Sequence, residues 1–251
     1  MGFKWLCGLL LIVYISCNPV LAANYSVGPV VNELGKGVKT GSLKISNDDS
    51  KPLYMQVRLF SWAQNDEGKS VYQADESLVF FPHTMTIQPK DSRLVRIGIK
   101  VPASSIEKSY VLFLEELLAP VDNQAPAEDR NKGTVIGIAT RFGVPVYLKP
   151  LKEHAAAVIS PVSLTKGKAS VAVSNTENVS LSIPKIQFYS ADYLSEYIPG
   201  GVILAGATRR FNMTIPQDVC NKLDKLDVTV KTRSPPLQLV ASTPVNNAQC
   251  Q

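Results

Sequence analysis

Apolar and polar residues alternate along short segments of this chain, and turn-forming residues separate the segments. Residues 42–46 alternate in this way, and the polar turn 47–50 follows; residues 55–59 alternate again before the turn 65–68. Successive side chains point to opposite faces of a strand, so this period of two predicts β-strands. Short strands with turn signals about every 8–12 residues are typical of β-sandwiches. We therefore predict an all-β protein.

The strands fall into two sets that divide near Pro150. Past Pro150 the alternation continues in segments at 169–174, 179–183, 185–189, 201–204, 209–215 and 227–231. The helix candidate is short, at 103–108. After removal of a leader, roughly 228 residues remain, enough for two domains of ordinary size. The sequence thus predicts two β-sandwiches.

Residues 133–150, GTVIGIATRFGVPVYLKP, predict one long strand. Ile136, Ile138 and Thr140 point to one face, while Gly137 and Ala139 leave the other face almost bare. Such a strand at a sheet edge promotes aggregation unless something pairs with it, or it can be kept open to pair with another chain. The alternative is that the isoleucines pack in the core of their own domain.

Residues 1–23 have the features of a secretory signal peptide. Lys4 precedes an apolar run at 6–15, and small residues at 22–23 suit cleavage. The alternative is a lipoprotein signal at Cys17, which Tyr14 suits poorly. The apolar run is short for a membrane span, and no later segment is long and apolar enough for one. We predict an exported, soluble protein that does not insert into a membrane.

The mature chain keeps two cysteines, Cys220 and Cys250. Two cysteines in an exported protein most simply form one disulfide, which would tie the region of Cys220 to the C-terminal tail. Two cysteines and two distant histidines make a metal site a poor expectation.

Charge and motifs exclude several classes of function. The 26 basic and 21 acidic residues give a formal net charge of +5, dispersed without a basic block, so nucleic acid is a poor partner. No nucleotide-binding, zinc-protease or serine-hydrolase motif is present. Glu115 and Glu116 are adjacent on a strand, so they face opposite ways, one buried and one exposed. We expect no enzyme and no cofactor.

Five segments together resemble the PapD-like periplasmic chaperones of the chaperone–usher pilus pathway. They are VGP at 27–29, GSLKISN at 41–47, FP at 81–82 with IQPKDSRLVRI at 87–97, YVLFLEEL at 110–117, and YLKP at 147–150. The resemblance covers most of residues 25–150, and past Pro150 it is only architectural. It implies two immunoglobulin-like sandwiches in an L-shaped (boomerang) arrangement, an N-terminal donor-strand domain at 24–150 and a C-terminal domain at 151–251.

The resemblance also implies a mechanism and partners. Pilus subunits are sandwiches that lack their last strand, and the chaperone's last N-terminal-domain strand fills the gap by donor-strand complementation in the periplasm. The chaperone then delivers the subunit to an outer-membrane usher. Two free chaperones could also pair through their donor strands. On this basis the donor residues are Thr134, Ile136, Ile138 and Thr140.

The family's best-known branch holds the subunit's C-terminal carboxylate with two basic residues. Here the matching positions are Val31 and Pro145, which carry no charge. The candidate substitutes are Arg141, Arg96, Arg93 and Lys100. An arginine can hold a carboxylate through two parallel hydrogen bonds, although these residues could equally be solvated or internally paired charges. The departure indicates a non-standard, archaic or spore-coat-like branch.

Two other functions compete with this one. A structural pilus subunit or adhesin would be one sandwich with an apolar N-terminal extension, which this chain does not show. A periplasmic carbohydrate-binding module would need an aromatic platform. Trp62 is the one tryptophan of the mature chain, and the other aromatic residues are scattered through strands, so a platform is poorly supported.

Overall fold

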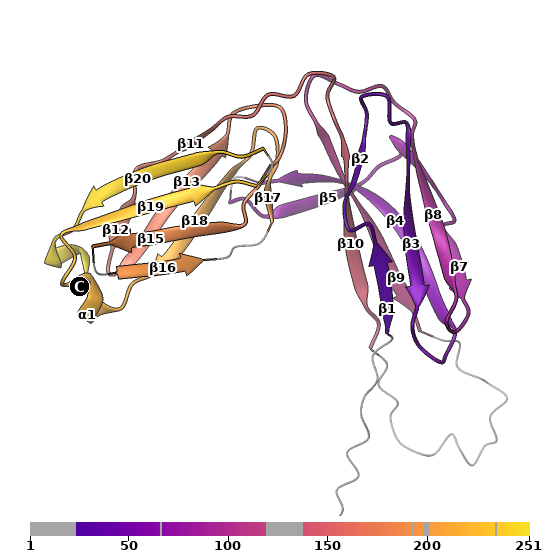
Figure 1. Cartoon of the computed structure of the whole chain (residues 1–251), viewed down its shortest axis with the longest axis horizontal. Coiled ribbons are helices and arrows are strands. Elements are labelled where there is room, and N and C mark those ends of the chain that lie inside the picture. Colours follow the sequence, from indigo (N-terminus) through magenta and orange to yellow (C-terminus); the bar gives the residue numbers. More distant parts are fainter. Residues whose placement is uncertain (1–23, 66, 119–137, 192, 198–200, 234) are drawn as a thin grey trace, which may run out of the picture.

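The protein consists of two β-sandwiches. The computed structural model describes residues 24–65, 67–118, 138–191, 193–197, 201–233 and 235–251. Figure 1 shows the sandwiches meeting at an angle, like the two arms of an L. The predicted all-β, two-sandwich fold is confirmed. The signal peptide predicted at 1–23 lies outside the described residues.

The N-terminal sandwich packs a four-stranded sheet, in the order β1-β3-β8-β6, against a larger sheet in the order β2-β10-β9-β4-β5, where β7 also pairs with β4. We call them sheet A and sheet B. The strands are β1 Tyr25–Gly28, β2 Asn32–Leu34, β3 Thr40–Asn47, β4 Leu53–Gln64, β5 Ser70–Ala74, β6 Leu78–Phe81, β7 Thr84–Ile87, β8 Ser92–Ile99, β9 Lys108–Leu117 and β10 Arg141–Leu148.

Alternate residues of these strands form the core between the two sheets. Leu43 and Ile45 of β3 and Val95 of β8 have no exposed surface, and Leu112 and Leu114 of β9 oppose them from sheet B. The intervening residues face outward. The period of two in the sequence therefore places one apolar face of each sheet inside.

The C-terminal sandwich has shorter strands. Strand β13 pairs with β11, β12 and β18, strands β14 and β17 form a small ladder, and the remaining sheet has the order β16-β15-β19-β20. The elements are β11 Ala157–Ile159, β12 Ser163–Thr165, β13 Lys168–Asn175, β14 Leu181–Ser182, β15 Lys185–Ser190, β16 Tyr193–Tyr197, β17 Val202–Ile203, β18 Thr208–Thr214, α1 Gln217–Cys220, β19 Lys225–Lys231, β20 Gln238–Pro244 and the 3₁₀ helix η1 Asn247–Gln249.

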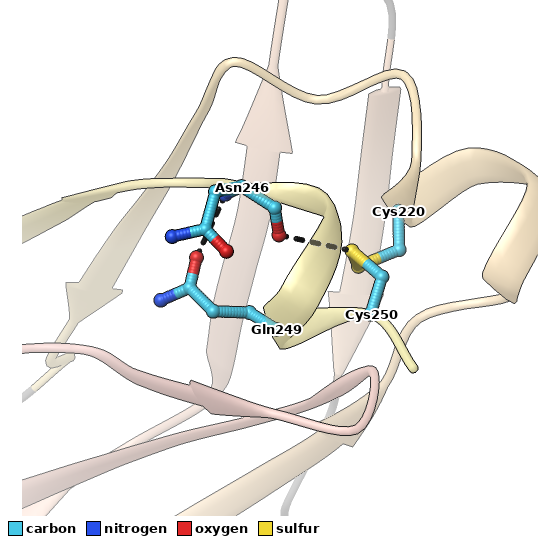
Figure 2. The surroundings of a disulfide bond; sticks show 4 residues. All are labelled: Cys220, Asn246, Gln249 and Cys250. Carbon is cyan, nitrogen blue, oxygen red and sulfur yellow. Dashed lines mark hydrogen bonds between the residues drawn. A yellow bond between two sulfur atoms is a disulfide. The ribbon is translucent and has the colours of Figure 1, made fainter.

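The predicted disulfide is confirmed: Cys220 at the end of α1 is bonded to Cys250, and both are buried. Figure 2 shows the bond beside η1, whose first turn is closed because the Asn246 N–H donates to Gln249 Oε1 at 2.8 Å. Sγ of Cys250 lies 3.9 Å from the Asn246 carbonyl, a packing contact because a disulfide sulfur has no hydrogen to donate. The bond fixes the C-terminal tail to the second core.

The helix predicted at 103–108 is wrong. Residues 103–107 have no regular structure, and Lys108 already begins β9. The Glu107 N–H donates to the Asn178 carbonyl at 2.9 Å, so the backbone of this segment pairs with the C-terminal sandwich instead of with itself. Within the described residues, no helix is long and apolar enough to cross a membrane.

Breaking the disulfide should destabilise the C-terminal sandwich. The bond closes a loop with a sequence separation of 30 residues, for which chain entropy gives about 3–4 kcal/mol. We expect the variant with Cys220→Ala and Cys250→Ala to lose that much unfolding free energy in urea titrations. A reductant should lower the stability of the native chain by a similar amount and leave the double variant unchanged. Equal sensitivity of both proteins to reductant would contradict this expectation.

Candidate binding site at the edge of strand β10

One side of β10 is only partly paired. Strand β9 pairs with β10 along its whole length, from Arg141 to Leu148. On the other side, the parallel strand β2 pairs only with Val146–Leu148. Among the described residues no strand pairs with Arg141–Val144 on this side, so the first part of β10 is an open sheet edge.

Two hydrogen bonds show which backbone groups face this edge. The Glu116 N–H donates to the Thr140 carbonyl at 2.9 Å, and the Lys149 N–H donates to the Leu34 carbonyl of β2 at 2.8 Å. Because backbone groups alternate in direction along a strand, even-numbered residues bond β9 and odd-numbered residues face β2 or the open edge. Arg141 and Gly143 thus offer an N–H and a C=O each, whereas Pro145 has no N–H and its C=O faces the Asn32 N–H of β2, which the register pairs with Val146.

The strand is shorter than the predicted one at 133–150. It begins at Arg141, and residues 138–140 have no regular structure. Thr134, Ile136 and Gly137 lie outside the described residues. Thr140 is held in place, because its Oγ1 bonds Glu116 Oε2 at 2.9 Å and Tyr25 Oη at 3.0 Å. The Thr140 N–H also donates to Glu116 Oε2 at 3.2 Å, so a side chain takes the place of one of the two backbone bonds that would continue the ladder.

The side chains of β10 change from exposed to buried along the strand. Val144, Val146 and Leu148 have no exposed surface and belong to the N-terminal core. Phe142, on the same face, is 38% exposed, and Ile138, which precedes the strand, is 57% exposed. The core of this sandwich therefore takes the side chains from Val144 onward and leaves Ile138 uncovered by the described residues.

The outer face of sheet B carries a contiguous group of aromatic rings. Phe113 lies edge-to-face with Phe60 and with Tyr72, at centroid distances of 5.6 and 5.2 Å, and Trp62 lies 6.3 Å from Tyr147. The inference that the aromatic residues are scattered is therefore wrong. Phe60 and Trp62 are two residues apart on β4, and this i, i+2 spacing is the signal that could have revealed the group.

Glu115 and Glu116 point away from each other, as the sequence predicts. Glu115 pairs with Arg141 on the outer face of sheet B, whereas Glu116 bonds Thr140. Both carboxylates are intermediate in burial, so the expectation of one buried and one exposed glutamate is wrong. Among the described residues, no three His, Cys, Asp or Glu side chains are grouped as a metal site requires.

The four candidate carboxylate anchors do not come together. Arg141 lies at the start of β10 in sheet B, beside the open edge. Arg93 and Arg96 are on β8 and Lys100 follows it, in the other sheet of the sandwich. Arg93 also forms an ion pair with Asp91 at 3.1 Å. Arg141 alone of the four is next to the unpaired backbone.

A buried ion pair holds the end of β10 at the junction of the two sandwiches. Lys149 Nζ lies 2.8 Å from Glu107 Oε2, whose side chain has no exposed surface, and 3.3 Å from Glu33. Glu107 Oε1 also accepts the Ser180 N–H of the C-terminal sandwich at 3.2 Å. Gly35 permits this close packing, because a Cβ there would lie 2.6 Å from the Lys149 carbonyl oxygen.

The same carboxylates change the titration of neighbouring groups. Burial disfavours the charged form of Lys149, but its hydrogen bond to Glu107 and the attraction of both glutamates outweigh burial and raise its pKa above the ordinary 10.5. Burial, with the negative charges of Glu107 and Glu33, raises the pKa of Tyr147. The junction therefore holds a charged lysine and a neutral tyrosine.

Further polar contacts join the two sandwiches. The Gln64 side chain donates to the Val202 carbonyl and accepts the Leu204 N–H, both at 2.9 Å. The Asn178 amide donates to the Ser105 carbonyl at 2.8 Å. These bonds link the end of β4 and the segment before β9 to the C-terminal sandwich, and Figure 1 shows the β4–β5 hairpin reaching toward β17.

Comparisons with known proteins agree with this architecture. Residues 30–153 match the family described as pili and flagellar-assembly chaperone, PapD N-terminal domain. A chain of the CsuC–CsuE chaperone–tip adhesion subunit pre-assembly complex, from archaic chaperone–usher Csu pili of Acinetobacter baumannii, is similar in structure with a TM-score of 0.60 and 15% identity, covering 86% of this chain and 98% of that one. The Pseudomonas aeruginosa CupB2 chaperone is similar with a TM-score of 0.54 and 12% identity, covering 88% and 100%.

A chain of the Salmonella enterica complex of SafA pilin with the SafB chaperone has a TM-score of 0.55 and 10% identity, covering 90% of this chain and 99% of that one. At sequence identities of 10–15%, the structural similarity to these proteins shows a shared fold and nothing more. No curated protein matches the sequence. The family match and the two-sandwich fold together make this chain a member of the PapD-like pilus-assembly chaperones. That family comprises chaperones and not enzymes.

The ion pair at the junction should matter most below the pKa of Lys149. Because the folded-state pKa is raised, the stabilisation by charged Lys149 is present below about pH 10.5 and is lost as the pH rises through the folded value. Lys149→Met should cost about 3–5 kcal/mol at neutral pH, because Glu107 stays buried without its partner. Urea titrations of unfolding across the alkaline range measure both effects.

Lys149→Arg is the matched control, since arginine keeps its charge over this range. Its unfolding free energy should fall less steeply with alkaline pH than that of the native chain. Identical slopes for the two proteins would show that Lys149 does not titrate in this window.

Proposed function

We propose that this protein is a periplasmic chaperone that binds and caps pilus subunits by donor-strand complementation and delivers them to an outer-membrane usher. The observation that carries the proposal is the open edge of β10 beside exposed Ile138. A subunit that lacks its last strand has unpaired backbone groups and an uncovered apolar groove, which are complementary to this edge. Pairing satisfies the first, and alternate apolar side chains fill the second.

The proposed donor side chains are Thr134, Ile136, Ile138 and Thr140. Of the two described here, Ile138 is exposed, which supports donation, whereas Thr140 already bonds Glu116 and Tyr25 and would have to exchange these partners. Two copies of the free chain could cover each other's edge in the same way. The boundary between the donor domain and the C-terminal domain is proposed at Pro150.

Other features support the remaining parts of the proposal. The leader-like residues 1–23 and the disulfide suit an oxidising compartment such as the periplasm. The uncharged Val31 and Pro145, together with likeness to a complex from archaic Csu pili, support membership of an archaic branch. The complexes of CsuC with CsuE and of SafB with SafA are precedents for pilus subunits as partners. Phe60 and Phe113 pack edge-to-face and carry Arg58 and Arg141 over their ring faces, so these two rings offer a sugar no open face.

Ile138→Asp should leave the protein folded and weaken subunit capture. Loss of one buried isoleucine, about 1.5–3 kcal/mol, predicts roughly 10- to 100-fold weaker binding. The measurement is co-purification with a pilus subunit that is co-expressed with this chain, together with the fraction of that subunit that aggregates. Val158→Asp is the matched control, because Val158 is also 57% exposed but lies in the C-terminal sandwich. Undiminished capture by the Ile138 variant would refute the donor role.

A further inference from the structure

Thr140 is bonded to one strand of each sheet of the N-terminal sandwich. Its Oγ1 lies 3.0 Å from Tyr25 Oη of β1, in sheet A, and 2.9 Å from Glu116 Oε2 of β9, in sheet B. A carboxylate oxygen only accepts hydrogen bonds, so the one hydroxyl hydrogen of Thr140 goes to Glu116, and the Tyr25 hydroxyl donates to Thr140. We call these three residues the clasp.

The clasp also changes the backbone pairing just before β10. Extended by one residue, the β9–β10 register places Thr140 opposite Glu116, as a pair that would normally exchange two N–H···O=C bonds. One of them forms, from the Glu116 N–H to the Thr140 carbonyl, but the Thr140 N–H donates to the Glu116 carboxylate at 3.2 Å. Glu116 therefore accepts both hydrogens that Thr140 can donate.

The Tyr25 side of the clasp belongs to a firmly bonded part of sheet A. Tyr25 packs against the N-terminal core and lies opposite Asn47 in the β1–β3 pairing. Asn47 is 1% exposed, and its side-chain amide donates to the carbonyls of Lys51 and Ile87 at 2.8 and 3.0 Å. Thr140 is thus bonded to a segment that is itself fixed by the hydrogen bonds of a buried side chain.

The clasp lies where β10 stops contributing to the core of its own domain. Val144 has no exposed surface, Phe142 is 38% exposed, and Ile138, two residues before Thr140, is 57% exposed. The chain after Thr140 therefore packs in its own sandwich, whereas Ile138 is left uncovered by the described residues. A fixed Thr140 defines the point from which this uncovered part departs.

We propose that Tyr25 and Glu116 are positioning residues that hold Thr140 as the fixed base of the donor strand. The inference rests on the proposed function and gives Thr140 a different task from Ile138. Thr140 keeps its partners within the chain when a subunit is captured, and Ile138 enters the groove of the subunit. A base that is fixed before binding reduces the conformational entropy that the donor strand loses on capture, and so strengthens capture.

Two substitutions of Thr140 distinguish a fixed base from a side chain that fills the groove. Thr140→Val keeps the shape but loses the hydroxyl, and it should weaken capture of a co-expressed pilus subunit about three- to tenfold. Thr140→Ser keeps the hydroxyl and should restore capture to within about twofold. A groove-filling role predicts the reverse order, because valine is the more apolar of the two. That reverse order would overturn the proposal and leave the proposed function intact, whereas a native chain that captures no subunit would contradict both.

Tyr25→Phe tests the positioning role without changing β10. Removal of one hydroxyl should weaken capture about two- to fivefold, and in a chain that already carries Thr140→Val it should have no further effect, since Tyr25 acts through Thr140. Tyr193→Phe is the control, because it removes the same group from a half-buried tyrosine of the C-terminal sandwich. Undiminished capture by the Tyr25 variant, or losses that add in the double variant, would overturn the proposal.

Amide hydrogen exchange of the free chain separates positioning from general support of the sheet. Tyr25→Phe and Glu116→Met, which removes the acceptor at a similar side-chain length, should each speed exchange of the Thr140 N–H severalfold. The amides of Leu112 and Leu114, in the buried part of β9, should exchange at the native rate. Equal acceleration at all three amides would mean that the clasp only stabilises the sheet, and an unchanged Thr140 rate would mean that it holds nothing; either result overturns the proposal.

Discussion

The backbone of β10 has hydrogen-bonding groups on two sides, and the N-terminal sandwich uses both sides only at Val146–Leu148. Upstream, from Arg141 to Val144, one side is bonded to β9 and no strand in the described part of the chain pairs with the other. An unpaired edge next to exposed apolar side chains is normally avoided because it promotes aggregation. Here β2 pairs only with the end of β10 and leaves the edge uncovered. The core of the domain does not depend on this edge, because the β10 side chains that belong to it begin at Val144.

The two faces of this edge have different chemistry. The face that continues into the core carries Phe142 and, before the strand, Ile138, so it suits an apolar groove. The outer face carries Arg141, Glu115 and the ring of Phe113, so it suits a polar or charged neighbour. A strand added at this edge would bury apolar side chains on one face and meet charged side chains on the other.

Much of this fold could be predicted from the sequence because its strands alternate strictly. The alternating segments predicted at 42–46 and 55–59 lie within β3 and β4, and their apolar residues Leu43, Ile45, Val57 and Leu59 are buried. Strands such as β5, with all five residues exposed, have no apolar face and gave no signal. The helix at 103–108 failed because the partner of its backbone, Asn178, is far away in the sequence. The same holds for Glu115 and Arg141, which lie on β9 and β10 and are brought opposite each other by the register of the sheet.

Pro145 has a consequence for the strength of any complex formed at this edge. Its nitrogen carries no hydrogen, and the register that pairs Val146 with Asn32 places its carbonyl against the Asn32 N–H of β2, so a guest strand gains both backbone bonds at Arg141 and Gly143 and none at Pro145. The proline therefore limits the number of backbone hydrogen bonds that β10 can form with a guest strand. On the proposed function, this limit keeps the affinity of β10 for the subunit moderate. Another strand that forms more backbone hydrogen bonds with the subunit can then replace β10 without any input of chemical energy.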